Sequence, residues 1–419
     1  MIKIFHLSVS TVLLFIVMAS CGSSDVTSEN CIPPNNIESP SSIPEIEAMR
    51  TAMIAFRSSL SEDQLGRAST CLSDPRLTRW SNLPVPILSR DGILYSELTS
   101  PQIQSFQSVM RLFLSAEGYQ KVEEITTLAE GFLENIDSDL WGVDQYSVDM
   151  FGDPNTEGSW GFQLDGHHCA LNFMVHGDEV SIVPAFLGGE PIKGRFNGRE
   201  FDILVDEREL ALTVYRGMNE QELSAAVSDG SSATMVLAPP SEGSDRFGGD
   251  YDYSQFTNGL KYSEMSDLTK ANIISLMREF VYNLNPVFAV QWWNDVMENV
   301  DETYFVWIDE VNNPSATTPF YYRIYNPYLW AEYNTEPPVG DGIEDWNHAH
   351  TVIRIPNNPM TRNGGDYNVF ASLINGGGPR TLLEHYQLAD HHSHNVVSLD
   401  YRLKGVKHKH LHKRRHHLH

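Results

Sequence analysis

The sequence has few cationic side chains and few cysteines, and both shortages narrow the possible functions. Its 419 residues include 29 Lys and Arg against 55 Asp and Glu, which gives a formal net charge of −26. A body this acidic repels phosphate backbones, so no nucleic-acid partner is expected. Only four cysteines occur and no C-x-x-C pair is present, so neither a thiolate zinc knuckle nor a C-x-x-C redox site is expected.

Several catalytic motifs and long apolar runs are also missing. The chain has no G-x-S-x-G, H-E-x-x-H or Walker A sequence, and no G-x-G-x-x-G motif after a predicted strand. Beyond the first twenty-one residues, no segment is apolar enough to predict a membrane-spanning helix. What is present is a hydrophobic content of 41% with 11% aromatic residues, enough for a sizeable core.

The N-terminus is typical of an exported lipoprotein. Residues 1–21 combine an early Lys3 with a short apolar run and end in Met-Ala-Ser-Cys, which resembles a lipobox with Cys21 as the lipidated residue. No aspartate stands directly after Cys21, so we expect a lipid-anchored protein of the cell envelope, in the outer membrane if the cell has one. The alternative is an ordinary secretory signal and a secreted protein. Residues 22–42 are rich in Ser, Asn and Pro and predict a flexible tether to the membrane.

The remaining cysteines agree with export. Cys31 and Cys71 can form a disulfide in an oxidising compartment, which would fasten the tether to the first helix. Cys169 lies in an apolar segment and is expected to act as a small buried hydrophobic residue. The sequence leaves the oligomeric state open.

Hydrophobic periodicity predicts an α+β fold. The predicted helices are residues 45–71 with a restart at Ser61, 101–118, 120–136, 207–215, 220–227 and 267–284. The predicted strands are residues 146–151, 161–164, 169–175, 179–186, 303–308, 320–324, 329–333 and 350–354. We therefore expect a helical N-terminal part, followed by a mixed or antiparallel sheet flanked by helices. Residues 43–395 would form one domain, and residues 396–419 a basic, His-rich disordered tail.

Histidines are the residues with the clearest chemical potential. His348 and His350 are two positions apart, so in a strand both fall on one face and can bind one ion. His167 and His168 are adjacent and would face opposite sides of a strand, so that one of them can line the same site. Glu332 lies in a neighbouring predicted strand and can supply a carboxylate. Three imidazoles and a carboxylate suit a divalent Zn, Mn, Fe or Cu ion. The alternative is that these histidines are structural.

Several segments together resemble the uncharacterised bacterial family known as domain of unknown function 3500. The most specific are Trp160–His168, Leu171–Phe173 and Pro184–Gly188, preceded by Ser147–Pro154. Further similar segments are Leu60–Pro84, Leu114–Tyr119, Tyr321–Ile324, His348–Arg354 and Leu382–Tyr386. The resemblance extends from about Glu45 to His391 and implies a single exported domain. At position 334 an aspartate is expected, whereas this chain has Asn334.

The sequence supports three hypotheses on function. In the first, the protein is a metal-dependent enzyme in which Arg323 or Arg354 holds an anionic group of a small substrate. In the second, the same site binds a metal or a small ligand without turnover. In the third, the protein is an interaction lipoprotein with structural histidines. Glu332 or His385 would complete the metal site or orient a ligating imidazole.

Overall fold

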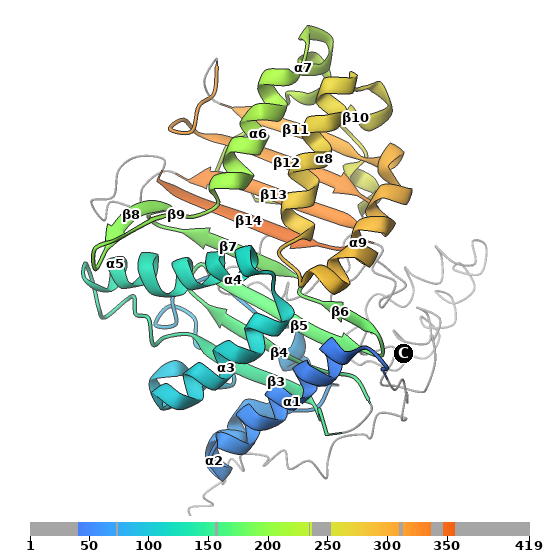
Figure 1. Ribbon diagram of the computed structural model, residues 1–419. Coiled ribbons are helices and arrows are strands. Elements are labelled where there is room, and N and C mark those ends of the chain that lie inside the picture. Colours follow the sequence, from blue (N-terminus) through green and yellow to red (C-terminus); the bar gives the residue numbers. More distant parts are fainter. Residues whose placement is uncertain are drawn as a thin grey trace, which may run out of the picture.

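The computed structural model describes residues 41–72, 74–155, 158–233, 235–236, 253–309, 313–336 and 347–356. Within them, one large sheet carries helices on one of its faces (Figure 1). The opposite face packs in part against shorter segments that contribute Leu72, Trp80 and Phe256 to a second apolar cluster. The predicted α+β class is confirmed.

The predicted helices are present, but the one predicted over residues 101–118 ends at Phe113. The one predicted over residues 120–136 begins at Ala116 and includes the π-helical segment Glu124–Ala129. The helices are α1 (Pro44–Ser59), α2 (Glu62–Ala68), α3 (Ser100–Phe113), α4 (Ala116–Glu123), α5 (Glu130–Glu134), α6 (Val205–Gly217), α7 (Glu220–Ala226), α8 (Asp267–Val281) and α9 (Pro286–Glu298). The predicted restart at Ser61 is confirmed, because its hydroxyl accepts from the Gln64 backbone N–H and caps α2. The sequence reasoning did not predict α9.

The two predicted strand clusters form one sheet. Its strands are β1 (Ser69–Thr70), β2 (Ile93–Leu94), β3 (Ser147–Gly152), β4 (Trp160–Gly166), β5 (Cys169–His176), β6 (Glu179–Ser181), β7 (Ala185–Gly189), β10 (Leu260–Lys261), β11 (Tyr304–Asp309), β12 (Phe320–Asn326), β13 (Leu329–Glu336) and β14 (His348–Arg354). The order is β1-β3-β4-β5-β7-β14-β13-β12-β11-β10, with β2 on β3 and β6 on β5. Among these described strands, all pairs are antiparallel except β1 with β3.

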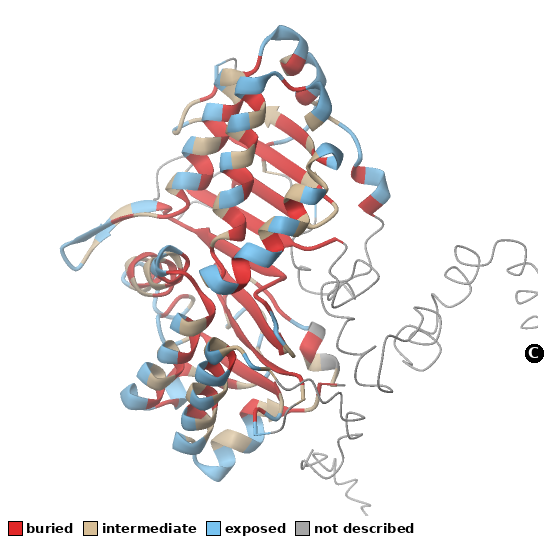
Figure 2. Ribbon diagram, turned by 45° about the vertical axis from the view of Figure 1, so that its right-hand side comes forward, coloured by how far each residue is buried: buried red, intermediate tan, exposed pale blue. Residues whose placement is uncertain are grey.

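Both faces of the central strands are buried, as the red strands of Figure 2 show. On β13, Leu329, Ala331 and Tyr333 belong to the main apolar core, whereas Trp330 belongs to the second cluster. This is the alternation that a strand imposes on its side chains. The residues that alternate with Leu329, Ala331 and Tyr333 therefore project from the opposite face of the sheet, which is the face that carries the histidines.

The fold consists of two similar repeats. The first contains α1, α2, α3 and α4 with β2 to β5 and β7, and the second contains α6, α7, α8 and α9 with β10 to β14. The tripeptide Tyr-Ser-Glu precedes the third helix of each repeat, at residues 95–97 and 262–264. In each repeat the first helix packs on the third, and a two-residue strand pairs with the first long strand, β2 with β3 and β10 with β11.

The repeats meet at equivalent positions. The Ser115 amide donates to the Asn283 carbonyl at 3.0 Å, and the Asn285 amide donates to the Phe113 carbonyl at 2.8 Å. Each contact joins the end of the third helix of one repeat to the end of the third helix of the other, so the two contacts are equivalent. In the sheet, β7 of the first repeat pairs antiparallel with β14 of the second. The joined sheet therefore has approximate twofold symmetry, with the β7–β14 seam at its centre.

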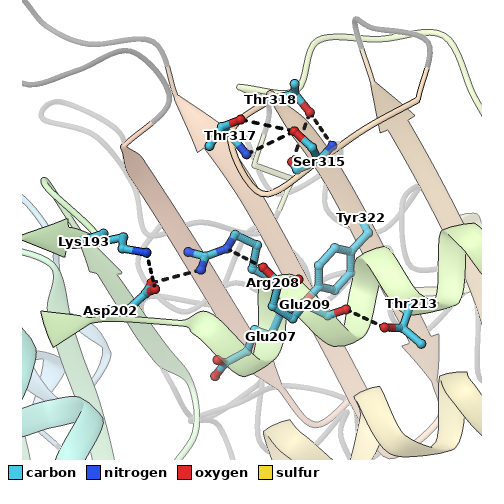
Figure 3. Close-up of polar contacts among 10 residues, drawn as sticks. All are labelled: Lys193, Asp202, Glu207, Arg208, Glu209, Thr213, Ser315, Thr317, Thr318 and Tyr322. Carbon is cyan, nitrogen blue, oxygen red and sulfur yellow. Dashed lines mark hydrogen bonds and ion pairs between the residues drawn. The ribbon is translucent and has the colours of Figure 1, made fainter.

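A small hairpin beside this seam connects the repeats. It consists of β8 (Lys193–Phe196) and β9 (Arg199–Asp202). Asp202 accepts from Lys193 Nζ at 3.3 Å and from Arg208 Nη2 of α6 at 3.0 Å (Figure 3). The Tyr322 hydroxyl of β12 donates to the Glu207 carbonyl at 3.1 Å. These contacts fix the start of α6 against the hairpin and the sheet.

Candidate metal centre

Strand β14 presents two histidines on one face, as predicted. In the ladder with β13, His350 lies opposite Asn334 and His348 lies opposite Glu336. Side chains of directly opposite residues project to the same side of a sheet. His348 and His350 are 7% and 4% exposed, so both rings are withdrawn from water.

The structure corrects the placement of His167 and His168. They do not continue a strand but form the two-residue turn between β4 and β5, which closes at the Gly166–Cys169 pair. His168 has a left-handed φ of 58°. Its amide donates to the Asn82 carbonyl at 3.1 Å, and its carbonyl accepts from the Gly188 amide at 2.8 Å. The turn therefore brings both rings to one side, with their centroids 3.8 Å apart.

Three imidazoles converge at the seam. Nε2 of His168 lies 3.1 Å from Nε2 of His348. The ring of His350 is centred 5.1 Å from that of His168 and 4.5 Å from that of His348. One ligand atom from each residue lies within 4.8 Å of the others, a group that could hold a metal ion. The predicted meeting of His168 with His348 and His350 is confirmed.

Oxygen atoms lie behind the histidine rings. Nδ1 of His350 lies 3.0 Å from Asn334 Oδ1 and 3.3 Å from Glu336 Oε1. Nδ1 of His348 lies 3.5 Å from Glu190 Oε1. Metal-ligating histidines commonly donate the other ring N–H to such an oxygen, which fixes the tautomer and ring orientation. The hydrogen bond to Asn334 occupies Nδ1 of His350 and leaves its Nε2 for an ion, whereas the 3.5 Å between His348 and Glu190 is longer than a hydrogen bond.

His167 belongs to a second group of potential ligands. Its Nδ1 lies 2.8 Å from Glu130 Oε2, and both side chains are buried. His167, His168 and Glu190 each place a ligand atom within 4.8 Å of the other two. The two groups share His168.

Burial keeps the rings of His168 and His348 neutral. Loss of solvent, with smaller effects of His167, His348 and His350, holds the pKa of His168 well below its ordinary value. Burial and the charge of His350 lower the pKa of His348 to about 2. Burial alone would raise the pKa of Glu336, but hydrogen bonding and the positive charge of His350 outweigh it and lower that pKa to about 2. Neutral imidazoles beside a carboxylate are the protonation states in which metal ligands bind.

Glu332 is in neither of these groups. Its Oε2 accepts from the Val236 amide at 2.6 Å and from the Tyr321 hydroxyl at 3.0 Å. Its Oε1 accepts from Trp330 Nε1 at 2.8 Å. In the register Glu332 lies opposite Val352, one pair beyond Asn334–His350 on the same face of the sheet. Among the described residues, the carboxylates that approach the histidines are instead those of Glu190, Glu336 and Glu130, which the sequence reasoning missed.

The two predicted arginines lie further along the same face. Arg323 lies opposite Glu332, and its Nη2 donates to Asn258 Oδ1 at 2.5 Å. Its guanidinium carbon is 5.5 Å from the centre of the Trp330 ring. Arg354 follows His350 by four residues, roughly 13 Å along a strand, and its guanidinium carbon is 5.4 Å from the centre of the Trp80 ring.

Some predicted residues lie outside the described part of the chain. They include Cys21, Cys31 and His385, as well as the tether and the C-terminal tail. Cys71 is disulfide-bonded, but its pairing with Cys31 stays a prediction. Cys169 is free and fully buried, which confirms its role as a small core residue.

The comparisons with known proteins identify a family. Residues 43–360 match the family described as "Protein of unknown function (DUF3500)", so the chain belongs to that family. Neither a curated protein nor a solved structure matches the chain. Across the described residues, no helix has the length and apolar character needed to cross a membrane.

Proposed function

We propose that His168, His348 and His350 bind a divalent transition metal (Zn, Mn, Fe or Cu), and that the protein is a metal-dependent enzyme. The proposal rests on one observation above all, the approach of the His168 and His348 Nε2 atoms to 3.1 Å. Two nitrogens that each bind zinc at about 2.0–2.1 Å lie about 3–3.5 Å apart in a tetrahedral site. Without an ion, two buried nitrogens this close share at most one proton.

The number of histidines favours an enzyme over a purely structural site. Structural zinc takes four protein ligands, whereas catalytic zinc typically takes three and leaves a position for water or substrate. An ion held here would polarise a bound water or a substrate oxygen. The burial of the three rings supplies the weakly solvated surroundings in which such polarisation is strongest.

The arginines support an anionic substrate class. Arg323 and Arg354 are on the same sheet face as the histidines and are 7% and 1% exposed. A guanidinium can bind a carboxylate or phosphate in a bidentate manner. We therefore propose that a small molecule with a carboxylate or phosphate group occupies this face between the metal and the arginines.

The location of the protein is part of the proposal. The signal-like residues 1–21 and the lipobox cysteine support a lipoprotein of the cell envelope, with Cys21 as its anchor. Replacing Cys21 with Ser would then release the protein from the membrane fraction. A variant that remains in the membrane fraction after a salt wash would contradict the lipid anchor.

Metal content tests the centre directly. The full chain and its His350→Ala variant are loaded with Zn²⁺, dialysed and analysed for metal. We expect the variant to bind about one ion fewer per chain. His176→Ala is the matched control, because His176 bonds to Ser159 Oγ at 2.7 Å and is in neither ligand group. Equal metal contents in all three proteins would contradict the proposed centre.

Activity assays test the proposal that the protein is a metal-dependent enzyme. The metal-loaded protein is assayed on chromogenic phosphate and carboxylate esters, before and after chelation. Metal-dependent hydrolysis that His350→Ala abolishes would support an enzyme. Metal bound by His168, His348 and His350 without metal-dependent turnover on these probes would favour the non-catalytic binding protein instead.

A further inference from the structure

The second ligand group lies against the first and has only His168 in common with it. His167 and Glu190 join His168 in a cluster whose ligand atoms are within 4.8 Å of one another, and all three are at most 8% exposed. His167 comes from the β4–β5 turn, and Glu190 follows directly after the last residue of β7. The group is therefore held by backbone elements that the sheet fixes in place.

The ring of His167 is oriented in the same way as the rings of the first group. Its Nδ1 lies 2.8 Å from Glu130 Oε2, and that carboxylate also accepts from the Gly142 amide through Oε1 at 3.1 Å. A carboxylate fixed in this way behind an imidazole is the usual outer partner of a metal-ligating histidine. It leaves Nε2 of His167 for an ion.

We propose that His167, His168 and Glu190 form a second divalent-cation position beside the first. His168 is common to both positions: with one ring nitrogen on each ion, its ring would release the remaining N–H proton to solvent and bridge the two ions as an imidazolate. Two histidines and a carboxylate suit the same Zn, Mn or Fe class of ion as the first position. The inference rests on the proposed metal centre, since it makes that centre a two-ion site.

The second ion has an electrostatic consequence. The Glu130 and Glu190 side chains are 2% and 3% exposed. Buried carboxylates are stable where a positive charge lies close to them. An ion at the second position supplies this charge to Glu190 directly and to Glu130 through the ring of His167.

Zinc stoichiometry separates the two positions. Full-length wild type, Glu190→Gln, His167→Ala, His348→Ala and the control His176→Ala are dialysed against the same free Zn²⁺ concentration, and bound zinc is counted per chain. All variants keep the C-terminal histidines, so the differences report only on the buried site. We expect Glu190→Gln and His167→Ala each to lose about one ion, and His348→Ala to lose a different one, so that Glu190→Gln combined with His348→Ala loses about two.

The outcomes distinguish this inference from the proposed function. If His348→Ala loses one ion while Glu190→Gln and His167→Ala lose none, the second position is wrong and the first stands. If no variant loses zinc relative to His176→Ala, both are wrong. Glu190→Gln preserves shape and size, so it keeps the test valid if removal of the His167 ring unfolds the chain. Circular dichroism of each variant confirms that the counted protein is folded.

Discussion

At the scale of single residues, Gly188 makes room for the histidine rings. A Cβ atom built on Gly188 would lie 2.6 Å from His350 Cδ2 and 2.9 Å from the Ala349 carbonyl oxygen. We predict that Gly188→Ala displaces the His350 ring and weakens Zn²⁺ binding about 10- to 100-fold, the usual cost of disturbing a ligand's support. Competition with a chromogenic chelator measures this affinity.

The control for this substitution is Gly66→Ala in α2. A Cβ atom at Gly66 meets nothing within 4 Å. Replacing a helical glycine by alanine should leave zinc affinity unchanged and stabilise the fold by roughly 0.5–1 kcal/mol. If Gly188→Ala binds zinc as tightly as Gly66→Ala does, the space at Gly188 has no role in the centre.

The sequence predicts the histidines of the centre better than its carboxylates. His348 and His350 could be placed on one face because strand alternation fixes it. Glu190 and Glu336 could not be recognised, because their approach to the rings depends on the β7–β14 and β13–β14 registers. In a chain with 55 Asp and Glu, proximity in sequence does not single out a carboxylate. One feature of the sequence did point to this region: an aspartate was expected at position 334, where this chain has Asn334. Glu336 lies two residues later on the same face of the strand.

At the scale of elements, the histidine turn shows why the local prediction failed. A two-residue hairpin is usually marked by Asn-Gly or Asp-Gly, but here the turn residues are His167 and His168. The equivalent turn of the second repeat, between β12 and β13, contains Pro327 and Tyr328. The histidine pair is therefore confined to the first repeat. The two-repeat organisation itself went unrecognised, although the repeated Tyr-Ser-Glu is visible in the sequence.

Helix caps interlock in the second repeat. The Glu222 carboxylate accepts from the Asn219 amide at 2.8 Å, from the Ser266 amide and from Thr269 Oγ1 at 3.0 Å. It therefore caps α7 and fastens the start of α8. We predict that Glu222→Ala destabilises the fold by about 2–4 kcal/mol, the sum of a lost cap and lost hydrogen bonds to a charged group. Urea denaturation measures the difference.

The neighbouring Gln221 provides the comparison. It is exposed, and only its backbone takes part in the cap. Gln221→Ala should change the free energy of unfolding by no more than about 0.5 kcal/mol. Equal stabilities of Glu222→Ala and Gln221→Ala would show that the interlocked caps do not stabilise the helix pair.

At the scale of the whole molecule, the buried histidines predict acid sensitivity of the metal-free protein. His348 faces His168, His350, Glu190 and Glu336, and its pKa in the folded state is about 2. In the unfolded chain an imidazole takes up a proton near pH 6.5. Below that pH the unfolded state binds more protons, so stability falls as pH decreases.

The urea midpoint of metal-free protein should therefore be steady above about pH 7 and decrease between about pH 7 and 5. Burial raises the pKa of Asp165 to about 6 and that of Asp149 well above its ordinary value, so these two carboxylates take up protons in the folded state and oppose the decrease. The histidine contribution is therefore read from the comparison of wild type with a histidine variant. His348→Gln should reduce the slope, because one neutral buried imidazole is removed. A pH dependence that is the same in His348→Gln as in wild type would contradict a neutral, buried His348.

The position of the centre at the seam predicts that metal holds the two repeats together. His168 belongs to the first repeat, whereas His348 and His350 belong to the second, and the β7–β14 ladder between them is five residue pairs long. An ion that binds only the folded state stabilises it by about 2.7 kcal/mol at one hundred times its dissociation constant. Because the ligands come from both sides of the seam, a bound ion opposes above all the separation of the two halves of the sheet.

Hydrogen exchange should therefore slow most at the amides of β7 and β14 when Zn²⁺ is added, with little change in α2. His350→Ala should lose this protection and His176→Ala should keep it. Equal protection of all elements by zinc would mean that the ion stabilises the fold globally rather than closing the seam.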